Sequence, residues 1–574
     1  MKSFKIEKDH IYLDGKPEKI VSGSMHYFRI HPDYWEDRLL KLRECGCNCV
    51  ETYVAWNLHE KKEGEFDFSG WLDLGKFIDM AEEMGLFLIL RPGPYICSEW
   101  DMGGLPWWLL KYSDIQLRCS QPLYLEKITP FLKKICEILR PRLISNGGCV
   151  IMVQVENEYG DIADDAAYME YIRDFYISEQ IDCDLVFSVG VSDGALERAS
   201  PKGVYASVNY RWDSAQALAL LKEKYPDQPG MVMELWNGKA MHWGEKFERR
   251  DLDEVADSVD KALVHGDLLN LYMFHGGTSF GFMNGALLPG CYVVQMTSYD
   301  VDAPLDEYGR RTPKYYREQE IICRHRGIGI ENTAKDTIIA SYPDVKFVGS
   351  APLSASPLRL IQSPTILSME QCDQGYGYII YDTFLTSYKD STVLSLPKIH
   401  DIAHIFIDGK YIKTIYRDDA DKTVTLERGG KMRVSLLVEN MGRINGGIST
   451  LYDMKGLIGC IAVNGATHFG YNIYSAPIDT LPIKYDSLPM ANTPTFYKYV
   501  FNAEEVCDTV LHPVGFERGV AFINGFNLGR HWNIENSENK LFVPAPFIKK
   551  GKNEIVIFDV MPTGAEKSVR LSEF

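Results

Sequence analysis

The stretch CVIMVQVENE, residues 149–158, has the pattern of a short buried β-strand that ends in carboxylates. Parallel strands that are buried on both faces consist of nearly continuous apolar residues and are separated by helices. Seven further runs of this kind occur in the first 330 residues. They are KIVSGSMHY (19–27), CNCVETYVAW (47–56), LFLILRPGP (86–94), LVFSVG (185–190), GVYASVNY (203–210), MVMELW (231–236) and LLNLYMFHGG (268–277).

Amphipathic helical patterns separate most of these runs. They cover residues 33–45, 71–85, 124–143 and 251–263, and only the connection after the fifth run lacks a clear long helix. Eight strand–helix units in about 330 residues predict a (β/α)8 TIM barrel. A doubly wound open sheet is the alternative, but it would need a glycine-rich phosphate turn after its first strand, and this sequence has none there.

The pattern changes from about residue 345 onward to short alternating runs with turn signals. The stretches AHIFIDGKYIKTIY (403–416) and GVAFINGFNLGRHW (519–532) each have the pattern of two strands joined by a tight turn. We therefore predict an α/β barrel over residues 1–335, followed by two all-β domains of sandwich or jelly-roll type. The predicted limits of these two domains are 336–480 and 481–574.

Composition limits the class of protein and of partner. The 574 residues are too many for one hydrophobic core, which agrees with several domains. The net charge of −18 argues against nucleic acid and anionic membranes as partners. The N-terminus is too charged for a signal peptide, and no run of eighteen apolar residues predicts a membrane span. The 13 cysteines include no CxxC pair, which favours free thiols and a cytoplasmic location.

Two carboxylates carry the functional prediction. Chemistry in such a barrel occurs at the carboxyl ends of the strands, where Glu158 ends the fourth run and Glu234 lies in the seventh. These strands face each other across the barrel mouth, so both side chains can flank a bound sugar. Hydrolysis of a glycosidic bond needs one carboxylate to attack the anomeric carbon and one carboxyl group to protonate the departing oxygen. One strand-end glutamate alone is more often an ion pair or a cap, but two among Trp, Tyr and Asn favour catalysis.

At these residues the sequence closely resembles glycoside hydrolase family 35, the β-galactosidases. The most specific matches are QVENEYG (154–160) and ICSEWDMGGLP (96–106), and further matches such as GVAFINGFNLGRHWN (519–533) extend over nearly the whole chain. The resemblance implies a barrel followed by two β domains, the second of them galactose-binding-like. It also implies removal of terminal non-reducing β-D-galactose from oligosaccharides by a retaining exo-mechanism, with a small oligosaccharide or glycoside as the partner.

The resemblance further implies a role for each matching residue. Glu158 resembles the acid/base and Glu234 the nucleophile that forms a covalent glycosyl-enzyme intermediate. The residues expected to bind substrate are Tyr53, Cys97, Ser98, Glu99, Asn157, Trp236, Lys239 and Tyr299. Neither a metal nor an organic cofactor is expected.

One departure from the family pattern keeps alternatives open. In ELWNGKAMHWG (234–244), Lys239-Ala240-Met241 replaces Trp-Phe-Asp, and Phe282 stands where relatives often carry tyrosine. Both changes predict an altered sugar pocket. The alternative is therefore the same fold and mechanism with glucosamine, glucose or an acidic sugar, or a transglycosylase. A non-catalytic sugar-binding protein is disfavoured because both glutamates are present. We also expect a homodimer.

Overall fold

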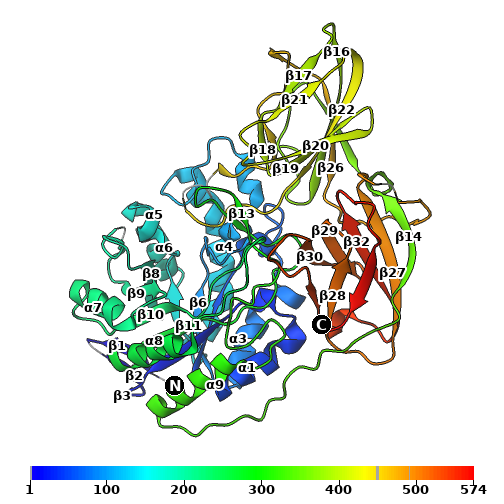
Figure 1. Cartoon of the computed structure of the whole chain (residues 1–574). Coiled ribbons are helices and arrows are strands. Elements are labelled where there is room, and N and C mark those ends of the chain that lie inside the picture. Colours follow the sequence, from blue (N-terminus) through cyan, green and yellow to red (C-terminus); the bar gives the residue numbers. More distant parts are fainter. Residues whose placement is uncertain (1–2, 9, 199, 448–451, 490, 574) are drawn as a thin grey trace.

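The computed structural model describes residues 3–8, 10–198, 200–447, 452–489 and 491–573, and its N-terminal part is a closed barrel of eight parallel strands (Figure 1). The strands follow the chain order around the barrel, and the last one pairs with the first. They are β4 (Ile20–Met25), β5 (Cys49–Tyr53), β6 (Phe87–Arg91), β7 (Val150–Gln154), β8 (Asp184–Gly190), β9 (Tyr205–Tyr210), β10 (Met231–Trp236) and β11 (Leu268–His275). Seven of them lie within a predicted run, and β8 begins one residue before its run, so the barrel prediction is confirmed.

Helices surround the barrel on its outer side (Figure 1). They are α1 (Trp35–Glu44), α2 (Trp56–His59), α3 (Leu74–Glu83), α4 (Pro122–Leu139), α5 (Tyr159–Ile162), α6 (Ala166–Ser178), α7 (Ser214–Lys224), α8 (Leu252–His265) and α9 (Pro313–Arg326). The four predicted helices are present as α1, α3, α4 and α8. As expected, the described residues between β8 and β9 form no helix.

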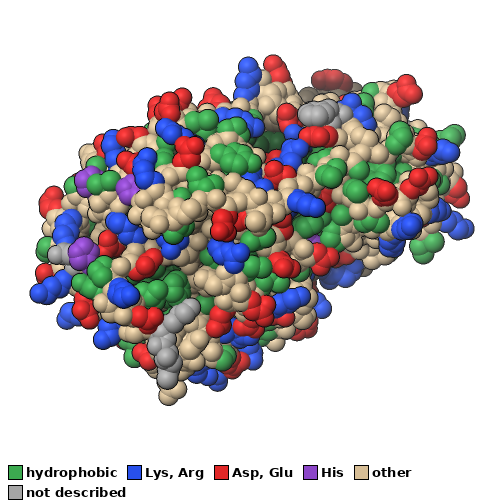
Figure 2. All heavy atoms as spheres, turned by 90° about the horizontal axis from the view of Figure 1, so that it is seen from below, with side chains coloured by type: hydrophobic (Ala, Val, Ile, Leu, Met, Phe, Trp, Pro, Cys, Tyr) green, Lys and Arg blue, Asp and Glu red, His purple; other side chains and the backbone are tan. Residues whose placement is uncertain are grey.

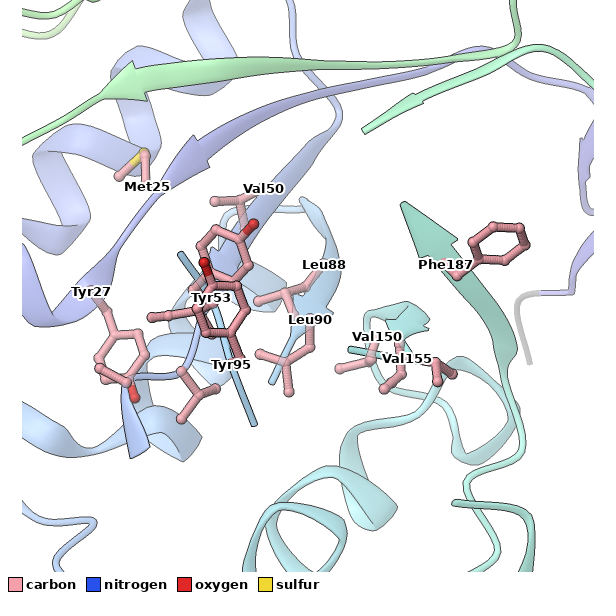
Figure 3. Packing of buried hydrophobic residues seen from close by; sticks show 14 of the residues in the cluster. Met25, Tyr27, Val50, Tyr53, Leu88, Leu90, Tyr95, Val150, Val155 and Phe187 are labelled. Atoms are coloured by element: carbon pink, nitrogen blue, oxygen red, sulfur yellow. The ribbon is translucent and has the colours of Figure 1, made fainter. Parts of the chain in front are cut away.

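The outward faces of the strands form one apolar layer with these helices. Val50, Leu88, Leu90 and Val150, from three neighbouring strands, belong to this layer and are fully buried (Figure 3). Because side chains alternate along a strand, the residues between them point into the barrel. In β5 the inward positions run from the apolar Cys49 to Glu51 and Tyr53 at the carboxyl end.

A small antiparallel sheet, which the sequence did not predict, closes the amino end of the barrel. It consists of β1 (Phe4–Glu7), β2 (His10–Leu13) and β3 (Lys16–Pro17). Its Ile6 and Ile11 join a separate apolar cluster with inward residues of the barrel such as Met231 and Met233. The barrel is therefore filled and apolar at this end, which leaves its carboxyl end for polar side chains.

The first all-β domain contains a six-stranded sheet, a four-stranded sheet and a short two-stranded sheet, with an apolar core formed from all three. The six-stranded sheet has the order β15 (Arg359–Ser363), β26 (Tyr471–Ala476), β16 (Tyr378–Ser387), β22 (Gly430–Glu439), β19 (Ile402–Ile407) and β20 (Lys410–Tyr416). The smaller sheets are β21 (Thr423–Leu426), β17 (Thr392–Ser395), β24 (Ala462–Val463) and β25 (Ala466–Thr467), and β18 (Lys398–His400) with β23 (Gly456–Ile458). The predicted hairpin at 403–416 is β19–β20.

The second all-β domain consists of a five-stranded and a three-stranded sheet. Their orders are β14 (Lys346–Pro352), β27 (Thr495–Ala503), β32 (Gly551–Asp559), β29 (Arg518–Ile523) and β30 (Phe526–Trp532), and β31 (Leu541–Val543), β28 (Thr509–Val514) and β33 (Ser568–Leu571). The predicted hairpin at 519–532 is β29–β30. Strand β14 lies within the range 336–480 of the predicted first β domain, yet it pairs with β27 of the second. The chain thus enters the second domain, builds the first and returns.

The composition also led to expectations about cysteine thiols, surface charge and membrane-spanning segments. All thirteen cysteines are free. Acidic and basic side chains are interspersed over the face of the molecule seen in Figure 2. Among the described residues, no helix is both long and apolar enough to span a membrane, and no group of His, Cys, Asp and Glu side chains could hold a metal ion.

Candidate active site

A cavity of about 290 Å³ opens at the carboxyl end of the barrel. Its walls come from the ends of β5, β10 and β11 and from the segments that follow β6, β7, β9, β10 and β11. Every predicted site residue except Asn157 lines it: Tyr53, Cys97, Ser98, Glu99, Glu158, Glu234, Trp236, Lys239 and Tyr299. Tertiary structure thus brings together residues that are up to 246 positions apart in the sequence.

Glu234 on β10 is held by three hydrogen-bond donors. The hydroxyl of Tyr53 donates to its Oε1 at 2.8 Å, and Arg91 Nη2 donates to the same oxygen at 2.5 Å. The indole nitrogen of Trp236 donates to Oε2 at 2.7 Å. Hydrogen bonds from a cation and two neutral donors are strong constraints on a carboxylate. The three donors therefore fix the Glu234 carboxylate in position, with 4% of the residue's surface exposed.

Arg91, which ends β6, was not among the predicted site residues. Its guanidinium also donates to Asn157 Oδ1 at 2.6 Å and to Gln154 Oε1 at 2.7 Å, and it lies 4.1 Å from the centre of the Tyr53 ring. Burial acts to lower its pKa, but Tyr53 and the carboxylates of Glu234 and Glu51 raise it above its ordinary value overall. A charged residue at the end of a buried strand was the signal that could have identified it.

Glu158 has a different environment. It follows β7 as the residue before α5, and Asn209 Nδ2 donates to its Oε1 at 3.0 Å. Burial raises the pKa of Glu158 to about 8, and the negative charge of Glu234 adds to this effect, while the Asn209 hydrogen bond opposes it. Glu158 therefore holds its proton at neutral pH, unlike an ordinary carboxyl group.

The two residues before Glu158 lie behind the cavity. Glu156 is fully buried and forms a two-bond ion pair with Arg118, in which both N–H···O distances are 2.8 Å. Asn157 accepts hydrogen bonds from Arg91 and Gln154 through Oδ1, while its buried Nδ2 has no partner among the described residues. Because Asn157 does not line the cavity, its predicted contact with a sugar hydroxyl stays a prediction.

The loop Cys97–Ser98–Glu99 has an unusual backbone. All three residues have positive φ angles, of 53°, 58° and 49°, a region that L-residues adopt only at a cost in free energy. Arg29 holds the loop, because its guanidinium donates to Ser98 Oγ at 2.7 Å and to the Ser98 carbonyl oxygen at 2.6 Å. The hydroxyl of Tyr299 donates to the Glu99 carboxylate, and the Tyr299 ring lies 3.9 Å from the Arg29 guanidinium carbon. This end of the cavity is therefore polar, and several side-chain contacts hold its loop.

The two departures from the family pattern, at Lys239 and Phe282, lie in different parts of the structure. Lys239 lines the cavity, and its ammonium group lies 3.2 Å from Glu245 Oε2, with both side chains about two-fifths exposed. Phe282 does not line this cavity. It stacks parallel to Tyr376 and lies 5.0 Å from the Arg530 guanidinium carbon, in an apolar cluster with residues of both β domains. The expectation that Phe282 shapes the sugar pocket is therefore wrong, because the loop after β11 turns this side chain toward the domain interface.

Several cavity residues were missed by the sequence prediction. Arg211, His242, Tyr272 and Leu287 line the cavity, and Tyr272 lies 3.3 Å from Tyr299, hydroxyl to hydroxyl. Tyr272 lies near the end of a predicted strand, which was a usable signal. Arg211 directly follows β9, which was also a usable signal. His242 and Leu287 come from segments whose path depends on the first β domain and on the neighbouring loops.

The arrangement has a clear chemical capacity. One carboxylate accepts hydrogen bonds from three donors, and the pKa of a second carboxyl group is raised, both on the wall of one small cavity. Two carboxyl groups in such different environments suit one nucleophile and one acid. Hydroxyl, carboxylate and aromatic groups around them match the hydroxyls and the apolar face of a sugar ring.

Comparison with known proteins identifies the family of this chain. The sequence matches a family model described as glycosyl hydrolases family 35 over residues 10–325. It also matches models described as the beta-galactosidase first all-beta domain, over residues 366–477, and the beta-galactosidase galactose-binding domain, over residues 494–553.

Similar proteins match along most of their length. Beta-galactosidase-1-like protein 2 from Homo sapiens is 37% identical over 571 residues, which cover 95% of this chain and 87% of that protein. A beta-galactosidase from Xanthomonas manihotis is 38% identical, with coverage of 91% and 88%. A beta-galactosidase from Bos taurus is 35% identical, with coverage of 97% and 91%. The chain therefore belongs to glycosyl hydrolase family 35, the β-galactosidase family, and is a glycosidase.

Proposed function

We propose that the enzyme removes terminal, non-reducing β-D-galactose from oligosaccharides by double displacement with retention of configuration. Glu234 is the nucleophile and Glu158 the acid/base. The observation that carries the proposal is the contrast between the two groups: Glu234 accepts three hydrogen bonds, and the pKa of Glu158 is raised to about 8.

The first step forms a glycosyl-enzyme intermediate. A carboxylate oxygen of Glu234 attacks the anomeric carbon, the bond from that carbon to the leaving oxygen breaks, and Glu158 gives its proton to that oxygen. Tyr53, Arg91 and Trp236 orient the Glu234 carboxylate for this attack. Departure of the proton leaves Glu158 as a carboxylate at the moment when Glu234 becomes a neutral ester.

The second step reverses these roles. Glu158 takes a proton from a water molecule, whose oxygen attacks the anomeric carbon from the side that the leaving group vacated. The ester bond breaks, and Glu234 regains its charge and its three hydrogen bonds. Two inversions at the anomeric carbon give the β-sugar as the product.

The shape of the cavity supports exo action. Its volume of about 290 Å³ is at the lower end of the range for ligand sites. The Cys97–Glu99 loop and Tyr299 line it together with Glu158 and Glu234, so a terminal sugar can meet these polar groups and the reacting carboxyls at once. The similarity to proteins named beta-galactosidase supports galactose as that sugar.

A second candidate keeps the mechanism but changes the sugar. Lys239 places an ammonium group on the cavity wall, which favours a β-linked sugar with an acidic substituent. Glu245 already forms an ion pair with the Lys239 ammonium group, with Oε2 3.2 Å from Nζ, so we place galactose first.

A panel of nitrophenyl β-glycosides separates the two candidates. The panel holds the galactoside, glucoside, glucuronide, glucosaminide and N-acetylglucosaminide, with Glu234→Gln as the inactive control. We expect turnover of the galactoside, and proton NMR of the first product should show the β-anomer before mutarotation. Preferred release from the glucuronide would replace galactose by an acidic sugar, and an α-anomer as the first product would refute retention.

Glu158→Gln tests the role of the acid separately. Substrates with good leaving groups, such as dinitrophenyl galactoside, need little proton donation, so we expect this variant to retain far more of its first-step rate on them than on disaccharides. Equal losses on both classes would refute the assignment of Glu158.

Two further proposals come from the sequence. We propose a cytoplasmic location, with short imported oligosaccharides as substrates, and a homodimeric state. Cell fractionation and light scattering of the purified protein test these two statements.

A further inference from the structure

A second, larger cavity of about 720 Å³ adjoins the catalytic one. The two share Arg211 and Trp236 as common walls. The second cavity lies over the carboxyl ends of β8 and β9 and the beginning of α7. Its lining also includes Val191, Ser192, Trp212, Gln216 and Leu220.

The position of this cavity relative to the acid indicates its role. Asn209 lines the second cavity and donates the 3.0 Å hydrogen bond to Glu158. An acid that protonates the leaving oxygen must lie beside it, so the leaving group has to extend on the Glu158 side of the scissile bond. The Cys97–Glu99 loop and Tyr299 line only the catalytic cavity, and neither lines the larger one.

The walls of the second cavity suit a sugar ring. The side chain of Trp212 is 60% exposed, which is unusual for an aromatic ring of this size. The guanidinium carbons of Arg211 and Arg250 lie 4.8 Å and 5.1 Å from its ring centre and hold it in place. A ring that is fixed yet exposed offers an apolar surface on which the face of a pyranose can stack.

Polar groups accompany this ring. No described residue forms an ion pair with Arg211, and its buried Nε has no hydrogen-bond partner among the described residues. Gln216 and Ser192 add an amide and a hydroxyl. Asp213 and Glu223 also line the cavity and oppose the charge of Arg211, which favours a neutral ligand over an anionic one.

We propose that Trp212, Arg211 and Gln216 form the binding site for the neutral sugar residue on the leaving-group side of the scissile bond. The proposal rests on the assignment of Glu158 as the acid. The same site would hold an acceptor sugar after the first step. Its hydroxyl, in place of water, could then attack the anomeric carbon while Glu158 takes the hydroxyl proton and the ester bond to Glu234 breaks.

The test compares substrates with and without a leaving-group sugar. β-Galactosyl fluoride has a leaving group too small to reach Trp212, whereas β1,3-, β1,4- and β1,6-linked galactosyl-glucose disaccharides fill the second cavity. We expect Trp212→Ala to lower kcat/KM by about tenfold on the preferred disaccharide, the effect of losing one aromatic stack. On the fluoride, kcat/KM should change by less than about twofold, which also shows that the variant is folded.

Two further variants sharpen the comparison. Trp212→Phe keeps an aromatic ring and should recover most of the disaccharide activity. Phe384→Ala removes another exposed aromatic residue, 59% exposed on the first β domain, and should leave both substrates unaffected. We also expect Trp212→Ala to lower the ratio of transfer to hydrolysis when glucose is added as an acceptor.

The outcomes are distinguishable. Equal losses on the fluoride and on the disaccharides, or no loss on either, would overturn the leaving-group site while leaving the proposed function intact. If the wild-type enzyme released galactose from neither substrate class, the proposed function would fail first, and this inference with it.

Discussion

Replacing Glu234 by glutamine is expected to lower the pKa of Glu158 from about 8 to about 6. The substitution keeps the size of the side chain and removes its charge. Two unit charges about 5.5 Å apart, the separation typical of retaining enzymes, interact by about 3 kcal/mol at an effective dielectric constant of about 20. This energy corresponds to about 2 pH units.

The pKa should not fall to that of a free carboxyl group. Burial is the largest cause of the raised pKa of Glu158, and it persists in the variant. A fall of this size is what the mechanism requires. In the proposed mechanism, esterification of Glu234 removes its charge, so Glu158 becomes a stronger acid that is ionised at neutral pH and can act as the base.

Infrared difference spectroscopy measures this pKa directly. The carbonyl stretch of a protonated carboxyl group disappears on ionisation, and subtraction of the Glu158→Gln spectra assigns the band to Glu158. The same pKa should appear in the wild-type enzyme as an alkaline fall in kcat/KM centred near pH 8, because the acid must be protonated in the free enzyme. An unchanged pKa in Glu234→Gln would refute the electrostatic coupling, and a wild-type pKa near 4 would refute the acid assignment.

Three further substitutions test other parts of the structure. Tyr53→Phe removes the 2.8 Å hydrogen bond to Glu234, and we expect kcat to fall at least about tenfold without loss of folding; an unchanged kcat would mean that this donor is dispensable. Arg118→Met leaves buried Glu156 without its cation, which costs about 3–5 kcal/mol and should lower the Tm in calorimetry, whereas adding Glu156→Gln should restore part of it. Phe282→Tyr should change kcat/KM for galactosides by less than about twofold, because this ring lies in the domain interface. A larger effect would mean that Phe282 contributes to sugar binding.

Much of the architecture could be predicted from local patterns. Each barrel strand is a short apolar run, and each confirmed hairpin carries its own turn residues, Asp408-Gly409 and Asn524-Gly525. Such signals lie within about ten residues of one another and reflect burial and backbone conformation, so no knowledge of distant segments is needed. The same holds for Glu158 and Glu234, whose position at strand ends follows from the barrel itself.

Distant contacts explain what could not be predicted. Strand β14 precedes the first β domain in the sequence, and only its pairing with β27 places it in the second. Phe282 carries no local sign that it faces Tyr376 rather than a sugar. A side chain's direction on a long loop depends on which surfaces close over it, and those surfaces come from other domains.

The sequence by itself therefore determined the barrel, the all-β character of the region that follows it and the position of two carboxyl groups at strand ends, because strand periodicity and turn chemistry are local properties. Tertiary structure alone decided how these carboxyl groups differ. Hydrogen-bond donors from β5, β6 and β10 converge on Glu234. Glu158 accepts a hydrogen bond from Asn209 and lines the same cavity as Glu234. A pKa depends on burial and on charges within a few ångströms, and that neighbourhood exists only once the barrel has closed.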